Sequence, residues 1–440
     1  MDTIPNNWQL IKIKYLFDEF FGGSWGFDPV SSQITGLVKV IRVSEFEMNT
    51  LGLKDKISTL RSLDLDESSP KLVRKNDLIL EKSGGGEKTA VGRVILIDKD
   101  IKFPTVNSNF TNLCRPNNLV DPRFLVFSLN ELYMRGVTKK NIKQTTGIQN
   151  LDIQGFTNEK IFIPPLKEQA LISRYLDKKN QIINSLLEKL EKKIKLLKEQ
   201  KIVIINQLVT KGLDPNVEMK DSGNEWIGEI PKHWKSSKLK FVSKIFGRIG
   251  YRGYTVEDIV EEDNGCITLG PGNILNSSLN LDSRTFLSWE KYYESPEIQI
   301  FNGDVIFVKT GSTIGKSCLV KNIKHQMTIN PQIVVFKNLK IDPEYLFHQS
   351  ICPFFQSFFK TESAGGSTPT ISQEKIKDFK ILIPPREEQL KLSEEINKYV
   401  EKNLSLETKF RKKIKLLQEY RQALISSVVT GKIRITEDMF

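Results

Sequence analysis

The sequence predicts an α+β protein made of two copies of one unit, each a strand-rich domain followed by a long helix. The hexapeptide KKIKLL occurs at Lys192–Leu197 and again at Lys412–Leu417, 220 residues later in a chain of 440. The segment IFIPPLKEQ at Ile161–Gln169 returns with the same offset as ILIPPREEQ at Ile381–Gln389. Apolar residues then recur at seven-residue intervals, which favours long helices that pair with each other.

The part of each copy that precedes the long helix, here called its front, is predicted to be a mixed domain rich in strands. IPNNW at Ile4–Trp8 returns as IPKHW at Ile230–Trp234, and the offset between the copies varies in this part. A helix is expected after each Asp-Pro pair, at about Arg123–Leu132 and Glu344–Phe355. Apolar runs bounded by Gly, Asn and Ser predict strands at Leu78–Leu80, Val91–Ile97, Val305–Val308 and Ile333–Phe336.

The back of each copy reads as one long helix. A double proline precedes it at 164–165 and at 384–385, and proline is well suited to a first helical turn. Gly212 and Gly431 are the expected stops, and Asn403 is a polar residue on the stripe that either sets the register or contacts water. The positions expected to form the coiled coil are Leu176, Ile183, Leu190, Leu197 and Ile204, then Ile396, Leu406, Phe410, Leu417 and Leu424.

Helix length and chain direction together predict an antiparallel coiled coil. Roughly 40 helical residues extend ~60 Å, which is longer than a domain of this size is wide. Each helix must therefore pack on something else, and the nearest candidate is its duplicate. Because the second helix begins where the second domain ends, it has to run back towards the first, which gives approximate two-fold symmetry.

These expectations divide the chain into five segments. They are a first strand-rich domain at 1–164, a helix at 165–212, a linker at 213–223, a second strand-rich domain at 224–385 and a C-terminal helix at 386–440.

The charge balance favours an anionic partner. The net charge is +12 and the pI about 9.2, which is typical of nucleic-acid binding but also of a chain from a basic proteome. Four cysteines without a CxxC pair indicate neither a zinc site nor a disulfide framework. The N-terminus lacks an apolar signal core, and no apolar run approaches the ~18 residues that span a bilayer, so we expect a soluble cytoplasmic protein without a membrane partner.

The segment Met219–Lys235, the twin IPP-x-x-EQ motifs and the twin helices resemble the specificity subunit of type I restriction–modification systems. The resemblance covers the whole chain. It implies a non-catalytic, sequence-specific DNA-binding subunit whose two fronts are target-recognition domains, each reading half of a split site on double-stranded DNA. Because the fronts differ in sequence, we expect an asymmetric, bipartite site.

The resemblance also implies the partners. The helices would form the antiparallel coiled coil and dock two modification (methyltransferase) subunits, and restriction (motor-nuclease) subunits would join where present. S-adenosylmethionine, ATP and Mg²⁺ would belong to these partner subunits, and this chain would need no cofactor or metal.

Two pairs of loops are the candidate DNA-binding segments. Lys82–Arg93 matches Gly311–Ser317, and Lys143–Asn150 matches Ala364–Thr370. Each is either a DNA-facing loop or a conformationally demanding turn, and GYRGYT at 250–255 is either a surface turn or a further contact. The candidate residues are Lys82, Ser83, Lys88, Arg93, Lys143, Gln144, Thr145, Tyr251, Arg252, Lys309, Thr310, Ser312, Thr313, Lys316, Ser367 and Thr368.

Motifs that would make the chain itself an enzyme are incomplete. In Gly311–Ser317 the glycines are one residue too close for a phosphate-binding loop. Asn330-Pro331 lacks the aromatic residue that would stack on a flipped base in an adenine methyltransferase. Two alternatives to the specificity subunit remain: a self-contained adenine DNA methyltransferase of fused type, and a coiled-coil scaffold whose domains bind proteins.

Overall fold

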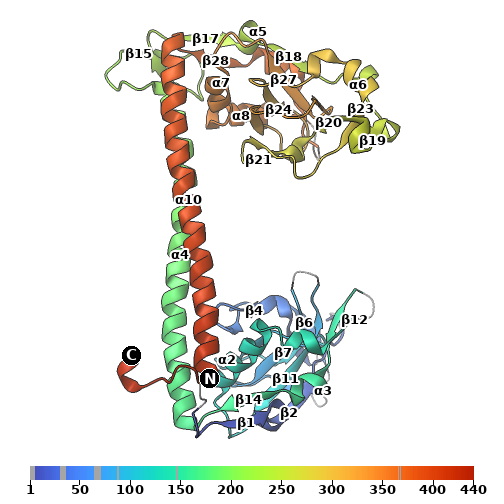
Figure 1. The fold of residues 1–440 in the computed structure, drawn as a ribbon, viewed down its shortest axis with the longest axis vertical. Helices are drawn as coiled ribbons and strands as arrows, with labels where there is room; N and C mark the ends of the chain where they lie inside the picture. The colour runs from blue at the N-terminus through green and yellow to red at the C-terminus, as the bar shows by residue number, and fades with distance from the viewer. Residues whose placement is uncertain are drawn as a thin grey trace. The chain divides into compact units, whose positions relative to one another are not determined.

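The computed structural model describes residues 5–29, 36–63, 71–86, 89–144, 147–364, 366 and 368–440, with the side chain of Tyr251 excepted. The chain divides into two compact units, Met1–Glu191 with Phe410–Phe440 (unit 1) and Lys192–Lys409 (unit 2). Each unit contains one strand-rich region and a part of both long helices (Figure 1).

Unit 1 is organised around a four-stranded antiparallel sheet whose strands β7 and β9 are buried throughout. Its order is β2 (Phe17–Gly22), β11 (Thr111–Pro116), β7 (Leu78–Glu81), β9 (Val94–Leu96). A second sheet joins β10 (Thr105–Asn107) in parallel to β3 (Leu37–Ile41), which pairs with β6 (Leu60–Ser62). Smaller sheets are β12 (Ile142–Gln144), β13 (Gln149–Leu151), β8 (Ser83–Gly84); β1 (Gln9–Lys12), β14 (Lys160–Ile163); and β4 (Phe46–Glu47), β5 (Gly52–Leu53).

Unit 2 repeats this topology, which confirms the duplication. Its four-stranded antiparallel sheet has the order β18 (Lys244–Gly247), β27 (Ile333–Lys337), β24 (Val305–Val308), β25 (Ser317–Leu319). The second sheet again has a parallel pair and runs β19 (Ile259–Val260), β23 (Phe286–Ser288), β20 (Gly265–Leu269), β26 (Met327–Ile329). Smaller sheets are β17 (Lys235–Lys238), β28 (Lys380–Ile383); β15 (Met219–Asp221), β16 (Glu229–Pro231); and β21 (Ile274–Leu275), β22 (Ser278–Leu279).

The helices follow the predicted pattern with two differences. The shorter ones are α2 (Pro122–Met134), α3 (Ile153–Asn158), α5 (Leu239–Val242), α6 (Trp289–Tyr293), α7 (Pro343–Ser350), α8 (Pro353–Glu362) and α9 (Gln373–Asp378). The helix predicted at Glu344–Phe355 is interrupted after Ser350, because Pro353 has no N–H to donate and starts a new helix instead. The long helices are α4 (Leu166–Lys211) and α10 (Arg386–Val429).

The C-terminal helix ends just before the glycine stop predicted at Gly431, although the segment assigned to it extends to residue 440. It stops at Val429, and Gly431 adopts φ 76°, a left-handed conformation that glycine accepts without steric cost. Beyond it the chain turns back within unit 1, where Ile435 is buried in the core and the Phe440 ring packs edge-on against Tyr175. The domain boundaries expected from the sequence stay a prediction, because the compact units divide within the two long helices.

In each unit α4 and α10 lie side by side and run antiparallel, as predicted (Figure 1). In unit 1 the start of α4 packs against the end of α10, since Leu176 and Val428 share one buried cluster. In unit 2 the end of α4 packs against the start of α10, where Val209 and Ile396 share another. Asn403 is buried, and its Oδ1 atom has no hydrogen-bond partner among the described residues.

A repeated polar joint attaches the first turn of each long helix to its strand-rich region. In unit 1 the buried Gln169 side chain accepts a hydrogen bond from the Asp121 N–H at 2.6 Å and donates to the Pro164 carbonyl at 2.8 Å. In unit 2 Gln389 makes the same bonds to Asp342 and Pro384, both at 2.8 Å. We call these two groups the glutamine joints.

A tryptophan from each IPxxW segment completes this attachment. The Trp8 indole donates to Glu168 Oε1 and the Trp234 indole donates to Glu388 Oε2, both at 3.1 Å. The glutamate directly precedes the joint glutamine in the sequence. The EQ pair therefore attaches both the IPxxW segment and the N-cap of α2 or α7 to the start of the long helix. None of the described helices combines the length and apolar character that crossing a lipid bilayer requires.

The glutamine joints give the first prediction. Gln389→Leu leaves the buried Asp342 N–H without its acceptor and the Pro384 carbonyl without its donor, so unit 2 should lose roughly 2–4 kcal/mol of stability. Gln169→Leu should do the same to unit 1. Hydrogen exchange read by mass spectrometry should show faster exchange in the altered unit. Gln200→Leu, at an exposed position of α4, is the control, and equal effects of all three variants would contradict the joint.

His348 gives a pH-dependent prediction for unit 2. Burial lowers its pKa to about 4, although the carboxylate of Glu344 nearby opposes the shift. In the unfolded chain His348 is protonated below about pH 6.5, whereas in the folded chain it stays neutral down to about pH 4. As the pH falls from 6.5 to 4, this difference lowers the stability of unit 2 by up to about 3 kcal/mol. His348→Phe, which copies Phe127 of unit 1, should flatten the urea midpoint over this range. Equal slopes for both proteins would refute the assignment.

Candidate nucleic-acid interface

The two candidate loops of unit 1 meet and form one surface. Strand β8, which begins loop 82–93, pairs with β13, which closes loop 143–150. The Ser83 hydroxyl donates to Asn150 Oδ1 at 2.6 Å, and the Leu151 N–H donates to the Lys82 carbonyl at 2.7 Å. Gly84 and Gly85 have φ of 116° and 63°, so this path of the chain requires glycine.

The corresponding loops of unit 2 meet in the same way. The Gly311 N–H donates to the Pro369 carbonyl at 2.9 Å, and the Ile371 N–H donates to the Lys309 carbonyl at 3.0 Å. Thr310 and Thr370 form an isolated β-bridge. The structure therefore brings together, within each unit, two loops that the sequence placed about 60 residues apart. We call these surfaces the loop faces of unit 1 and unit 2.

The candidate side chains of the unit 1 loop face differ in exposure. Gln144 is exposed, and Lys143 is 73% exposed although it forms an ion pair with Asp152 at 2.8 Å, which lowers the pKa of that carboxyl. Lys82 and Ser83 are half-buried. Lys88 and Thr145 lie outside the described residues.

Arg93 is committed to a buried ion pair. Its Nε and Nη2 atoms donate to the two oxygens of Glu81 at 2.8 and 2.9 Å, and the Glu81 side chain is 1% exposed. The hydrogen bond to this carboxylate raises the pKa of Arg93. In the sheet register of unit 2 the same two places hold Val308 and Lys316, so this ion pair belongs to unit 1 alone among the described residues.

The unit 2 loop face presents mainly small hydroxyl side chains and lysines. Ser312, Lys316 and Thr368 are exposed, Thr310 and Thr313 are half-buried, and Ser367 lies outside the described residues. Lys309 is half-buried, and burial lowers its pKa.

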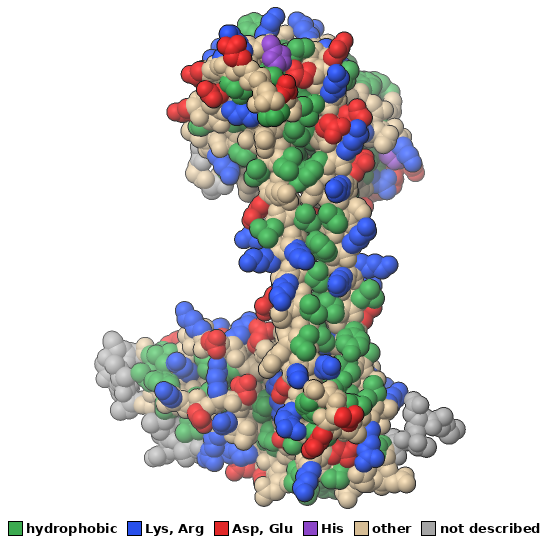
Figure 2. All heavy atoms as spheres, turned by 90° about the vertical axis from the view of Figure 1, so that its left-hand side faces the viewer, with side chains coloured by type: hydrophobic (Ala, Val, Ile, Leu, Met, Phe, Trp, Pro, Cys, Tyr) green, Lys and Arg blue, Asp and Glu red, His purple; other side chains and the backbone are tan. Residues whose placement is uncertain are grey.

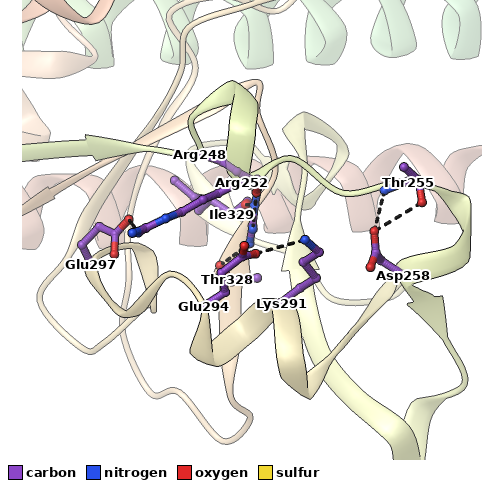
Figure 3. Close-up of polar contacts among 9 residues, drawn as sticks. All are labelled: Arg248, Arg252, Thr255, Asp258, Lys291, Glu294, Glu297, Thr328 and Ile329. Carbon is purple, nitrogen blue, oxygen red and sulfur yellow. Dashed lines mark hydrogen bonds and ion pairs between the residues drawn. The ribbon is translucent and has the colours of Figure 1, made fainter.

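A buried arginine that sequence reasoning did not select holds the GYRGYT turn. Arg248 is 5% exposed, and its guanidinium donates to the Ile329 carbonyl, the Thr328 hydroxyl and the Arg252 carbonyl at 3.1, 3.1 and 3.2 Å (Figure 3). Burial lowers the pKa of Arg248. Arg252 pairs with Glu297 at 3.2 Å, and the side chain of Tyr251 lies outside the described residues.

An aromatic cluster beside this turn was also missed. The rings of Trp289, Tyr292 and Tyr293 lie 5.2–6.2 Å apart, and Tyr293 is 64% exposed. Adjacent aromatics in a charged segment, W-E-K-Y-Y, were the available signal.

The predicted coiled-coil residues face inward to different degrees. Buried members are Leu176, Ile183, Leu190, Ile396 and Leu424, and half-buried members are Leu197, Ile204, Leu406, Phe410 and Leu417. None of them is exposed in this chain, and their role in subunit docking stays a prediction. Other apolar side chains of the two helices are exposed, namely Leu166, Ile182, Leu186, Leu196, Ile202, Val203, Leu390, Leu404, Leu416 and Tyr420. Figure 2 shows hydrophobic side chains between lysines and arginines along the helices.

The residues that suggested catalysis have structural roles. Asn330 Oδ1 accepts the Gln332 N–H at 3.0 Å, and its Nδ2 donates to Gln332 Oε1 at 3.1 Å, so the side chain closes a turn. Within the described ranges no three His, Cys, Asp or Glu side chains gather as a metal site would need.

Comparison with known proteins gives one result for both halves of the chain. The family model described as type I restriction modification DNA specificity domain matches residues 29–200 and 231–416. The type I restriction enzyme MjaVIII specificity subunit of Methanocaldococcus jannaschii is 24% identical over 439 residues, which cover 98% of this chain and 94% of that protein. The type I restriction enzyme EcoKI specificity subunit of Escherichia coli is 21% identical over 447 residues, covering 98% and 90%.

Solved structures share the fold. A chain from work on complex assembly and conformational transition of the type I R-M system has a TM-score of 0.73 at 14% identity, covering 98% of this chain and all of that one. The HsdS subunit from Thermoanaerobacter tengcongensis has a TM-score of 0.52 at 15% identity, with 98% of each chain covered.

The buried ion pair gives a prediction for unit 1. Arg93→Leu leaves the Glu81 carboxylate buried without a partner and should cost about 3–5 kcal/mol of stability. Adding Glu81→Val, which copies Val308 of unit 2, should restore most of this loss, because both charged partners are then gone. Urea unfolding of the wild type, both single variants and the double variant measures the coupling. Additive losses would show that the two side chains do not act as a pair.

Proposed function

The chain belongs to the family of type I restriction–modification DNA specificity subunits, and from this premise we propose that it reads an asymmetric, two-part site on double-stranded DNA. Each loop face would contact one half of the site. The observation that carries the proposal is the presence of the same two-loop arrangement in both units, built from different side chains.

The asymmetry of the proposed site follows from the chemistry of the two loop faces. Unit 1 offers Ser83, Lys143 and Gln144 beside three glycines, whereas unit 2 offers Ser312, Lys316 and Thr368. Amide and hydroxyl groups can hydrogen-bond to base edges, and lysine can bond to guanine or to phosphate. Identical units would read two copies of one sequence, so diverged units should read two different ones.

Phosphate contacts would supply much of the affinity. The chain carries a net charge of +12, and displaced counterions make such binding weaken steeply with salt. We propose the cytoplasm as the place of action, because the proposed target is DNA.

The long helices would dock two modification subunits through the repeated hexapeptide. Leu196 is 51% exposed and Leu416 is 53% exposed, and they occupy the same position in the two copies of KKIKLL. The preceding lysines match as well, since Lys195 and Lys415 approach Glu199 and Glu419 at 3.9 and 3.8 Å. Unit 1 contains one copy and unit 2 the other, so two copies of one partner would find the same surface twice.

The chemistry would then belong to the partners. We propose that this chain is not catalytic and that modification and, where present, restriction subunits bring S-adenosylmethionine, ATP and Mg²⁺. The fused adenine methyltransferase gains no support, because the matched family model describes DNA specificity in both halves of the chain. A protein-binding scaffold would be favoured only if the chain failed to bind DNA together with its modification subunit.

Exchange of one unit's front tests the division of labour. Replacing residues 1–164 with the front of another specificity subunit should change one half of the methylated motif and leave the other half unchanged. Sequencing that detects methylated bases, in cells with and without the gene, measures the motif. The reciprocal exchange of residues 224–385 is the matched control. A motif that changes in both halves, or in neither although the complex assembles, would contradict the proposal.

The docking surface gives a separate prediction. Leu196→Glu with Leu416→Glu should weaken assembly with the modification subunit at least tenfold, because each places a charge in the centre of an apolar contact. Either single variant should lose one of two bound subunits. Native mass spectrometry counts them. Ile202→Glu, at a 43% exposed α4 position about 120° around the helix from Leu196, is the control for an added charge. Unchanged stoichiometry in the double variant would refute the assignment.

A further inference from the structure

Unit 1 contains a cavity of about 430 Å³ beside its loop face, a volume within the range of small-ligand sites. Two aromatic residues, Trp25 and Phe110, and two arginines, Arg42 and Arg93, contribute to its lining, together with small polar residues. Ser83 belongs both to the lining and to the loop face, so the cavity is continuous with the candidate DNA-binding surface.

The two arginines are fixed in advance by carboxylates of the same unit. Arg42 donates to Glu45 Oε1 from Nη2 at 2.9 Å and from Nε at 3.3 Å, and the Glu45 side chain is 6% exposed. Arg93 is held by Glu81 in the same manner. A guanidinium that is held rigidly loses less entropy when it binds a further acceptor, and its planar set of donors suits a phosphate group.

A buried hydroxyl in the lining lacks a partner. Ser108 is 1% exposed, and its Oγ atom has no hydrogen-bond partner among the residues that the structure describes. Its backbone is fixed, because the Ser108 N–H donates to the Ile41 carbonyl at 2.9 Å and its carbonyl accepts the Thr111 N–H at 2.9 Å. An unpaired buried hydroxyl is unfavourable, so a ligand that supplies a donor or an acceptor here would gain affinity.

The aromatic residues complete the list of groups that a nucleotide needs. Arg61 lies over the Trp25 ring with its guanidinium carbon 4.6 Å from the ring centroid, which positions the indole. Phe110 is 43% exposed, while its carbonyl accepts the N–H groups of Lys82 and Ser83 at 2.9 and 3.1 Å. Bases stack on such rings with little sequence preference.

We propose that this cavity binds a nucleotide with an unstacked base, in which the aromatic residues contact the base, Ser108 bonds to it and Arg42 contacts phosphate. The nucleotide is either extruded from the target DNA or free in solution. The proposal depends on the proposed function only for the first source, since a free nucleotide needs no DNA.

The first experiment titrates the full-length chain with each of the four deoxynucleoside 5′-monophosphates by calorimetry and by saturation-transfer NMR. At least one should bind saturably. Phe110→Ala should weaken binding about 5- to 150-fold, as expected for loss of a stacking ring. Phe103→Ala, which truncates a similarly exposed ring outside the cavity, should leave binding unchanged.

Ser108→Ala provides a second variant that removes only the hydroxyl and should weaken binding about 2- to 10-fold. This variant leaves both aromatic rings in place, so its effect on binding is independent of the Phe110→Ala result. If no monophosphate binds and the DNA experiment below is also negative, or if binding is the same in Phe110→Ala and Phe103→Ala, the proposal is overturned.

The second experiment identifies the source. 2-Aminopurine is placed at successive positions of the half-site that unit 1 reads, and its fluorescence is followed as the assembled complex binds. A change that Phe110→Ala abolishes and Phe103→Ala retains shows that the base comes from DNA. Monophosphate binding without such a change shows a free nucleotide. If the complex binds its DNA site normally but shows neither monophosphate binding nor a change in 2-aminopurine fluorescence, nucleotide binding in the cavity is refuted. The proposed function is then unaffected.

Discussion

The attachment of each long helix to its strand-rich region is the constraint on which the rest of the fold depends. Gln169 and Gln389 join the first turn of each long helix to the N-cap residue of the preceding α2 or α7. The neighbouring glutamates accept hydrogen bonds from Trp8 and Trp234. Each unit also receives the end of the other helix, since a Cβ on Gly431 would lie 3.4 Å from the Trp8 ring and one on Gly212 would lie 3.3 Å from the Trp234 ring. Every unit therefore holds one helix start and one helix end, and the antiparallel direction is set locally in both.

The sequence predicted this frame well because its signals are local or repeated. The seven-residue spacing of Leu176, Ile183 and Leu190 depends on helix geometry alone, and all three are buried as expected. The end of the helix before Pro353 was missed, although a proline that cannot donate was a visible sign. The glutamines of the joints lie in the repeated IPP-x-x-EQ segments, but their hydrogen-bond partners became visible only in the structure.

The candidate site was harder to predict because burial and pairing are not visible in residue type. Arginine is a residue type that often contacts DNA, but the guanidinium of Arg93 forms an ion pair with the buried carboxylate of Glu81. Arg248 carries no motif, yet it fixes the turn that presents Arg252. Leu196 belongs to the same apolar pattern as its inward neighbours, and its exposure depends on one helical position. Glu81 lies 12 residues from Arg93 and Thr328 lies 80 residues from Arg248, and only the folded chain brings these partners together.

The distribution of differences between the units explains how one chain can read two unlike sequences. At the joints the copies keep the same residues, because a change there leaves buried backbone groups unpaired. In the four-stranded sheet, Glu81 and Arg93 of unit 1 occupy the register positions that Val308 and Lys316 occupy in unit 2, and both pairs are compatible with the sheet. Either a charged pair or an apolar side chain can fill that place, so the chemistry beside the loop faces is free to diverge. A fused duplication therefore allows two readers to differ while the frame that holds each of them stays fixed.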